Sequence, residues 1–259
     1  MHLRAVFSIL LGRTTVDEVP LWALGAGVVG CVLWGIAYLA VIITCQRQKT
    51  YGIPLAAICM NITWEILSVF FWVAVRNEPA FHYADIAWLA MDLVIMSQLL
   101  RFGREQQTIR QIRDSFYPVV AGTFILAFLG QYTFPMTYHD EDGFVLAFII
   151  NMGMSILFVF MCFARPDLRG LSYSVAWLKM LGTACESIMC VKWMPAKHPE
   201  ITNFSFFYFL YVTTFLFDCI YIAQLSAARR RLVAVTPASA SNSNSLTPHS
   251  ESSAVARSA

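Results

Sequence analysis

Four acidic residues and one lysine stand inside long apolar stretches of the sequence: Glu65, Asp92, Glu186, Asp218 and Lys179. An ionisable side chain at bilayer depth costs several kcal/mol, so each of these residues is a functional candidate by default. A carboxyl group in apolar surroundings favours its uncharged form and can act as a general acid near neutral pH. The chemistry that these residues predict is therefore proton transfer, either to a bound substrate or along a relay.

The acids share helical faces with other polar residues, because side chains three or four positions apart point the same way. Three faces follow from this spacing: Asn61, Glu65 and Ser68; Asp85, Trp88 and Asp92; and Tyr211, Thr214, Asp218 and Tyr221. Positions that face lipid could not satisfy such polar groups. The three faces are therefore expected to surround one interior cavity.

The elements that must position these residues are membrane-spanning helices. Of the 259 residues, 58% are hydrophobic and only 13% are charged, too few charges for the surface of a soluble domain. About 20 apolar residues cross a bilayer as a helix. Seven stretches qualify, roughly 21–45, 54–75, 83–101, 116–134, 143–164, 171–191 and 204–225. We predict an all-α polytopic membrane protein, a seven-transmembrane-helix bundle over residues 21–228 that follows a short N-terminal segment, 1–20.

The distribution of Lys and Arg between the loops predicts the orientation. Eleven follow the odd-numbered spans, whereas five lie on the opposite side. By the positive-inside rule, the N-terminus is lumenal and the C-terminus cytosolic, in the endoplasmic reticulum of a eukaryotic cell. Residues 229–259 begin with three arginines and continue with a Ser- and Ala-rich sequence, which predicts a basic stop followed by a disordered cytosolic tail.

With this orientation, three of the acids are expected in one layer of the membrane. Glu65, Asp92 and Asp218 lie about 7 to 11 residues from the cytosolic ends of their spans, at depths of roughly 10 to 17 Å. Lys179 leaves an alternative open: it could neutralise Asp92 or Asp218, and an acid paired in this way stays ionised and donates protons poorly. A buried carboxyl can also serve only to bond a neighbouring helix. The roles of Glu186 and Lys179 stay open.

Several catalytic motifs are missing from the sequence, which narrows the chemistry. There is no DDxxD motif for a magnesium diphosphate, no P-loop, no GxSxG and no HExxH. The loop HDEDG at 139–143 resembles a DxDD acid motif but ends in Gly143, between two spans where surface acids are ordinary. Ionisation of a diphosphate is therefore disfavoured, and no basic stripe suggests nucleic-acid binding.

Four local strings resemble one family of membrane enzymes. These strings are TYGIPLAAICMNITWEI (50–66), RGLSYSVAWLKMLGT (169–183), VKWMP (191–195) and LFDCIYI (216–222). They look like the fungal integral-membrane terpene cyclases of meroterpenoid and indole-diterpene pathways, such as those leading to pyripyropene, terretonin and paxilline. The resemblance covers about residues 20–230, and TYG followed by N..WE is its most specific part.

The resemblance implies a cofactor-independent and metal-independent terpene cyclase. Such an enzyme protonates the terminal epoxide of a prenyl chain attached to a polyketide or an indole, and the resulting cation drives cyclisation. The two catalytic acids of the family carry over to Glu65 and Asp218, with Asp92 as a supporting acid. Asn61, Trp64, Trp88 and Tyr221 are expected to line the pocket, where aromatic rings would stabilise the cation. The implied partners are the lipophilic epoxide and the bilayer, with a prenyltransferase and an epoxidase as pathway neighbours.

Two other classes of function remain as alternatives. A proton-coupled transporter would use the same intramembrane acids as a relay, but transporters usually show internal repeats or broken helices, and neither is evident here. A seven-helix receptor or scaffold would bind a ligand without converting it. The head group, ring number and stereochemistry of a product do not follow from the sequence.

Overall fold

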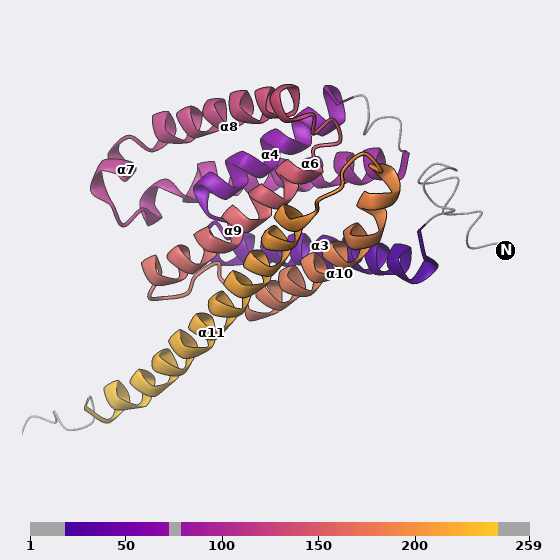
Figure 1. Cartoon of the computed structure of the whole chain (residues 1–259). Helices are drawn as coiled ribbons and strands as arrows, with labels where there is room; N and C mark the ends of the chain where they lie inside the picture. The colour runs from indigo at the N-terminus through magenta and orange to yellow at the C-terminus, as the bar shows by residue number, and fades with distance from the viewer. Residues whose placement is uncertain (1–18, 73–78, 243–259) are drawn as a thin grey trace, which may run out of the picture.

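The protein folds into a bundle of long helices, as a computed structural model that describes residues 19–72 and 79–242 shows (Figure 1). The long helices are α3 (Leu21–Gln48), α4 (Leu55–Phe70), α6 (Pro79–Phe102), α8 (Phe116–Tyr138), α9 (Phe144–Ala164), α10 (Tyr173–Lys197) and α11 (Ser205–Asn242). Two short helices, η1 (Arg104–Gln106) and α7 (Arg110–Asp114), connect α6 to α8. Each long helix covers one predicted span, and the predicted all-α membrane bundle is confirmed.

Six of these helices are long and apolar enough to cross a membrane, and α4 is the exception. Its 16 residues extend about 24 Å, less than the roughly 30 Å of a hydrocarbon core. The predicted stretch, 54–75, was too long because the helix closes early: the N–H groups of Phe71 and Trp72 both donate to the carbonyl of Leu67. The chain beyond Trp72, residues 73–78, lies outside the described residues.

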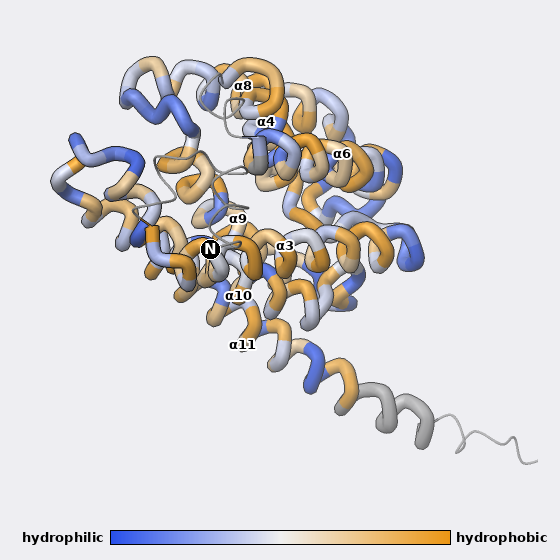
Figure 2. The backbone as a smooth tube through the Cα atoms, turned by 90° about the vertical axis from the view of Figure 1, so that its right-hand side faces the viewer, coloured by the Kyte–Doolittle hydropathy of each residue, from blue (hydrophilic) through white to orange (hydrophobic). Residues whose placement is uncertain are grey.

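The helices form two groups with α9 between them, as Figures 1 and 2 both show. Helices α4, α6 and α8 lie on one side, and α3, α10 and α11 on the other. The closest packing joins α3 to α10. A Cβ atom added at Gly30 of α3 would lie 2.5 Å from the Glu186 carboxyl, and one at Gly182 of α10 would lie 2.8 Å from the Trp34 ring. Glycines therefore let these two helices approach closely.

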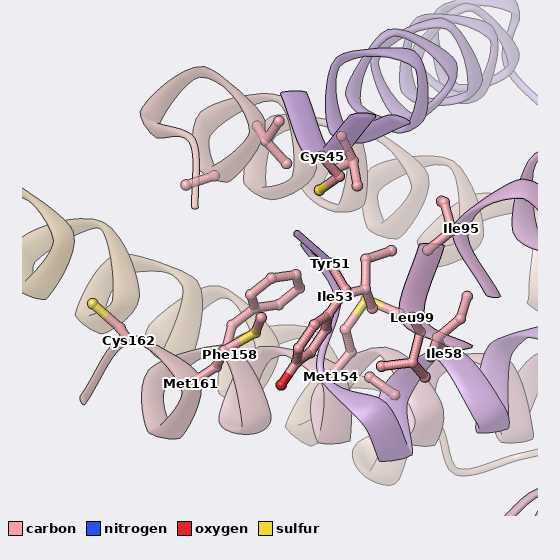
Figure 3. Close-up of a cluster of buried hydrophobic side chains, with 14 of the residues drawn as sticks. Cys45, Tyr51, Ile53, Ile58, Ile95, Leu99, Met154, Phe158, Met161 and Cys162 are labelled. Carbon is pink, nitrogen blue, oxygen red and sulfur yellow. The ribbon is translucent and has the colours of Figure 1, made fainter. Parts of the chain in front are cut away.

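A large apolar core fills one end of the bundle, where α3, α6 and α9 end and α4 begins (Figure 3). It includes Tyr51, Ile58, Leu99 and Phe158. The buried Arg165 fastens this end: its Nη1 donates to the carbonyl of Tyr51 at 2.5 Å, and its guanidinium lies 3.8 Å from the centre of the Tyr51 ring. Any cavity must therefore lie nearer the other end of the bundle.

Helix α11 is longer than the sequence suggested. The prediction began a disordered tail at residue 229, but the helix continues through the three arginines to Asn242. Alanine, arginine and leucine between 227 and 232 are strong helix formers, which accounts for the first part of the extension. The remainder of that predicted tail, 243–259, and residues 1–18 of the predicted N-terminal segment lie outside the described residues.

Candidate active site

A cavity of about 190 Å³ lies among α3, α4, α6, α9 and α10. Four carboxyl side chains line it: Glu65, Asp85, Asp142 and Glu186. Seven aromatic side chains make up much of the remaining wall: Trp34, Tyr38, Trp64, Phe81, Trp88, Phe144 and Phe148. Of the residues expected at the pocket, Asn61, Trp64, Glu65 and Trp88 are in its wall. The cavity therefore combines proton-bearing groups with a largely apolar, aromatic surface.

The predicted polar faces of α4 and α6 meet each other in a regular antiparallel register. Asn61 Nδ2 donates to Asp92 Oδ2 at 2.7 Å, and the Ser68 hydroxyl donates to Asp85 Oδ2. These two hydrogen-bonded pairs lie at opposite ends of the α4–α6 interface. Counting inward from both pairs along the antiparallel helices places Trp88 opposite Glu65. We call these six residues the α4–α6 seam. Glu65 and Trp88 lie midway between the two hydrogen-bonded pairs along their helices, and both line the cavity.

Glu65 is the acid of the seam without a polar partner. Its side chain is 5% exposed, and its Oε2 has no hydrogen-bond partner within residues 19–72 and 79–242. No salt bridge to Glu65 is formed in that part of the chain. Without an ion pair from the described residues to stabilise the carboxylate, burial favours the proton-bearing form. The environment of Glu65 is thus the one that a general acid requires.

Asp92 lies behind the cavity rather than in its wall. It is fully buried, and Asn61 links it to the hydroxyl of Tyr38, which accepts from the same Nδ2 at 2.7 Å. Asn61 and Tyr38 both line the cavity. Asp92 can therefore reach the cavity only through these two side chains, which suits a supporting acid.

Asp218 lies outside the wall of this cavity, so the expectation that it shares a cavity with Glu65 needs correction. That the two acids share one layer of the membrane stays a prediction. Lys179 Nζ lies 2.9 and 3.0 Å from the two Asp218 oxygens and 2.6 Å from the hydroxyl of Ser155. Asp218 is 1% exposed and is not part of the cavity wall. The lysine thus gives the Asp218 carboxylate a buried ion pair, which Glu65 does not have among the described residues. The alternative in which Lys179 neutralises Asp218 is the one that the structure adopts.

The Lys179–Asp218 pair still has one contact with the cavity. Lys179 Nζ lies 5.6 Å from the centre of the Trp34 ring, and Trp34 lines the cavity. A change in the pair would therefore act on the wall through this indole. The catalytic role of Asp218 itself stays a prediction.

Tyr221 was expected at the pocket but belongs to the apolar core. Its ring lies 5.2 Å from that of Phe158, and its side chain is buried. Helical spacing correctly placed Tyr221 on the same face of α11 as Asp218. At Tyr221, however, this face packs against α9 in the apolar core and not against the cavity.

Charged residues at the rim of the cavity contact one another. They were not singled out from the sequence. Asp142 Oδ2 accepts from Lys197 Nζ at 3.2 Å and lies 2.8 Å from His198 Nε2, so the α8–α9 loop is tied to the end of α10. Burial would raise the pKa of Asp142, but the His198 hydrogen bond and the Lys197 charge outweigh it and hold that pKa below its ordinary value. The hydrogen bond to Asp142 in turn raises the pKa of His198. The only signal in the sequence was the acidic loop HDEDG.

The fold and the cavity together define a class of protein: a polytopic helical membrane protein with an interior cavity that is lined by aromatic and carboxyl side chains. Comparison with known proteins narrows the class. The sequence model of the Pyr4-like transmembrane terpene cyclases matches residues 18–231. The chain belongs to this family.

Individual relatives agree with the family match. The chain is 27% identical to the Pyr4-family terpene cyclase mfmH of Annulohypoxylon moriforme, over 82% of this chain and 87% of that protein. It is 25% identical to the terpene cyclase macJ of Penicillium terrestre (65% of this chain, 66% of the relative). It is 27% identical to the terpene cyclase pyr4 of Aspergillus fumigatus (62% and 66%). No solved structure matches the chain.

Proposed function

We propose that this membrane terpene cyclase protonates the terminal epoxide of a prenyl chain, which is attached to a polyketide or an indole, and so starts a cationic cyclisation. The observation that carries the proposal is Glu65, a buried carboxyl in the wall of an aromatic cavity that forms no ion pair with the described residues. The reaction needs no redox step and no external group, because substrate and product are isomers.

In the proposed reaction, Glu65 donates its proton to the epoxide oxygen while the bond from that oxygen to the more substituted carbon breaks. The oxygen stays in the product as a hydroxyl group, and the carbon becomes a tertiary cation that the neighbouring double bonds attack in turn. Trp88, held opposite Glu65 by the register of the seam, offers its ring to the cation. The apolar walls keep out water, which would otherwise capture the cation.

The other acids are given indirect roles. Asp92 supports Glu65 by holding Asn61 and Tyr38 in the cavity wall and by adding a second carboxyl to the seam. Asp218 acts as a positioning residue: it holds Lys179 beneath Trp34. This role differs from direct proton donation, and the two can be separated by experiment.

The setting of the reaction belongs to the same proposal. A long prenyl chain partitions into the bilayer, so the enzyme would meet its substrate in the membrane of the endoplasmic reticulum. There it would follow a prenyltransferase and an epoxidase in the pathway. The predicted orientation places the N-terminus in the lumen and the cavity rim, with Asp142 and Lys197, on the lumenal side.

Conversion by membranes in D₂O tests the proposal. Membranes that contain the protein are given an epoxyfarnesylated aromatic polyketide or an epoxygeranylgeranylated indole. We expect a cyclised alcohol that is isomeric with one of the probes and has no carbon-bound deuterium, because the added proton goes to oxygen. Carbon-bound deuterium would indicate protonation of a double bond instead. No conversion of either probe, or uptake into vesicles without conversion, would contradict the proposal.

A further inference from the structure

A second carboxyl side chain reaches the cavity from the side opposite the α4–α6 seam. Glu186, on α10, is part of the cavity wall and is half-buried. Figures 1 and 2 place α3 and α10 on the other side of the bundle from α4 and α6. The cavity thus has one acid-bearing wall at Glu65 and another at Glu186.

The surroundings of Glu186 hold its carboxyl group in place without neutralising it. Cys31 of α3 donates its thiol hydrogen to Glu186 Oε1 at 3.3 Å, and a thiol is a weak donor. Gly30 leaves the space that the carboxyl occupies, since a Cβ at that position would lie 2.5 Å from Oε1. No ion pair to Glu186 is formed among the described residues. Glu186 is less buried than Glu65, and its carboxylate accepts the thiol hydrogen of Cys31, so this group can hold the negative charge that a base needs.

Two other carboxyl groups of the cavity wall already have polar partners. Asp85 accepts from Ser68 within the seam, on the same side as Glu65. Asp142 is bound by both Lys197 and His198 at the rim. Glu65, once it has given up its proton, lies beside the new hydroxyl group at the epoxide end of the substrate. The last cation of a cyclisation forms further along the chain, so the proton that ends the reaction must leave toward a different wall.

We propose that Glu186 is the base that ends the cyclisation. This inference rests on the proposed function. A carbon next to the final cation loses its proton to the Glu186 carboxylate, and the C–H electron pair becomes the new double bond. One proton enters the substrate at Glu65 and one leaves at Glu186, so the reaction remains an isomerisation. After the product leaves, water that enters the cavity can return the proton to Glu65.

The variant Glu186→Gln tests the assignment because an amide keeps the shape but cannot accept the proton. Membranes are given the probe that the wild type converts, and both epoxide consumption and the product mixture are measured. We expect the epoxide to be opened, more slowly than in the wild type. The wild-type alkene should fall by about tenfold or more as a share of products, with other alkene isomers and water-captured alcohols in its place.

A matched pair of glycine variants on α3 tests the position of the carboxyl group. Gly30→Ala displaces Glu186 and should shift the product mixture in the same direction as Glu186→Gln. Gly35→Ala should leave it unchanged, because a Cβ there meets nothing within 4 Å. This pair decides the question if Glu186→Gln does not accumulate in membranes.

Two results would overturn the assignment while leaving the proposed function intact. An unchanged product mixture in Glu186→Gln would show that another group removes the proton. Complete loss of epoxide consumption in a normally accumulated Glu186→Gln would place this residue in the opening step instead. Failure of the proposed function is distinguishable, because the wild type itself would then leave both probes unconverted.

Discussion

Two polar regions of the membrane interior differ in how their acids are satisfied. In the α4–α6 seam, Glu65 is buried, lines the cavity and has no ion-pair partner among the residues that the structure describes. In the other region, Asp218 is as deeply buried, but Lys179 and Ser155 complete its environment and no part of it lines the cavity. Both regions were sequence candidates for acid catalysis on the same grounds.

The comparison shows that burial alone does not make an acid a proton donor. Burial favours the neutral form, whereas an adjacent lysine favours the charged form, and for Asp218 the lysine is at hydrogen-bond distance. The seam therefore fits proton donation, and for the ion pair we propose a structural role at the cavity wall. The following experiments separate these two roles.

The largest effect is expected at Glu65. Glu65→Gln should lower the conversion of the epoxide by about 10² to 10⁴-fold, because the amide has no acidic proton to give. Conversion is measured in membranes at matched protein levels. Glu141→Gln makes the same change at an exposed loop glutamate and should have no effect. Wild-type turnover by Glu65→Gln would remove this residue from the mechanism.

The ion pair should mainly affect stability. Lys179→Met leaves the Asp218 carboxylate buried and unpaired, which costs about 3–5 kcal/mol, so less protein should accumulate in membranes. The double variant Lys179→Met, Asp218→Leu should regain most of this loss and a measurable part of the activity. A double variant that is stable but wholly inactive would instead support direct catalysis by Asp218.

A smaller effect is expected at Trp88. A lost cation–π contact is worth about 0.5–2 kcal/mol, so Trp88→Leu should slow cyclisation by roughly 2- to 30-fold. Trp88→Phe should lose less, because it keeps an aromatic face toward the cation. Trp22→Leu is the matched control, since Trp22 is 60% exposed on the outside of the bundle. Equal rates for Trp88→Leu and Trp88→Phe would argue against cation stabilisation by this ring.

The smallest effect is expected at the rim, as a dependence of stability on pH. The pKa of His198 is raised above its ordinary value of 6.5, so its contribution is present at lower pH and is lost as the pH rises through the folded-state pKa. The pKa of Asp142 is lowered, so its contribution is lost only in acid. The melting temperature should fall by a few °C at most between pH of about 6 and about 8, since such pairs are worth less than about 1 kcal/mol.

His198→Gln and Asp142→Asn should each flatten this part of the pH profile. The same dependence in either variant as in the wild type would assign it to other groups.

The sequence alone was enough to predict the helical bundle and the polar face of α4 that takes part in the candidate site. Every long helix was predicted because a span needs a long apolar run, and the faces of Asn61, Glu65 and Ser68 were predicted because helical spacing is fixed. The early end of α4 depends on two hydrogen bonds to Leu67, which no apolar pattern reveals.

Contacts between helices that are distant in sequence could not be predicted. Spacing places Lys179 and Asp218 on their own helices, but only packing decides that they meet. The same holds for Asp142, whose loop folds onto the end of α10, and for Tyr221, whose face turned out to pack in the core. A single sequence shows which residues share a face of a helix, but not which other helix packs against that face.

The protonation state of Glu65 in the resting enzyme is the most direct test of the account. Infrared spectra of the purified protein in lipid at neutral pH report the carbonyl stretch of protonated carboxyl groups. We predict a band from a protonated carboxyl in apolar surroundings that is present in the wild type and missing in Glu65→Gln. Spectra in which this substitution removes only an ionised carboxylate would contradict the central claim, because a carboxylate has no proton to give to an epoxide.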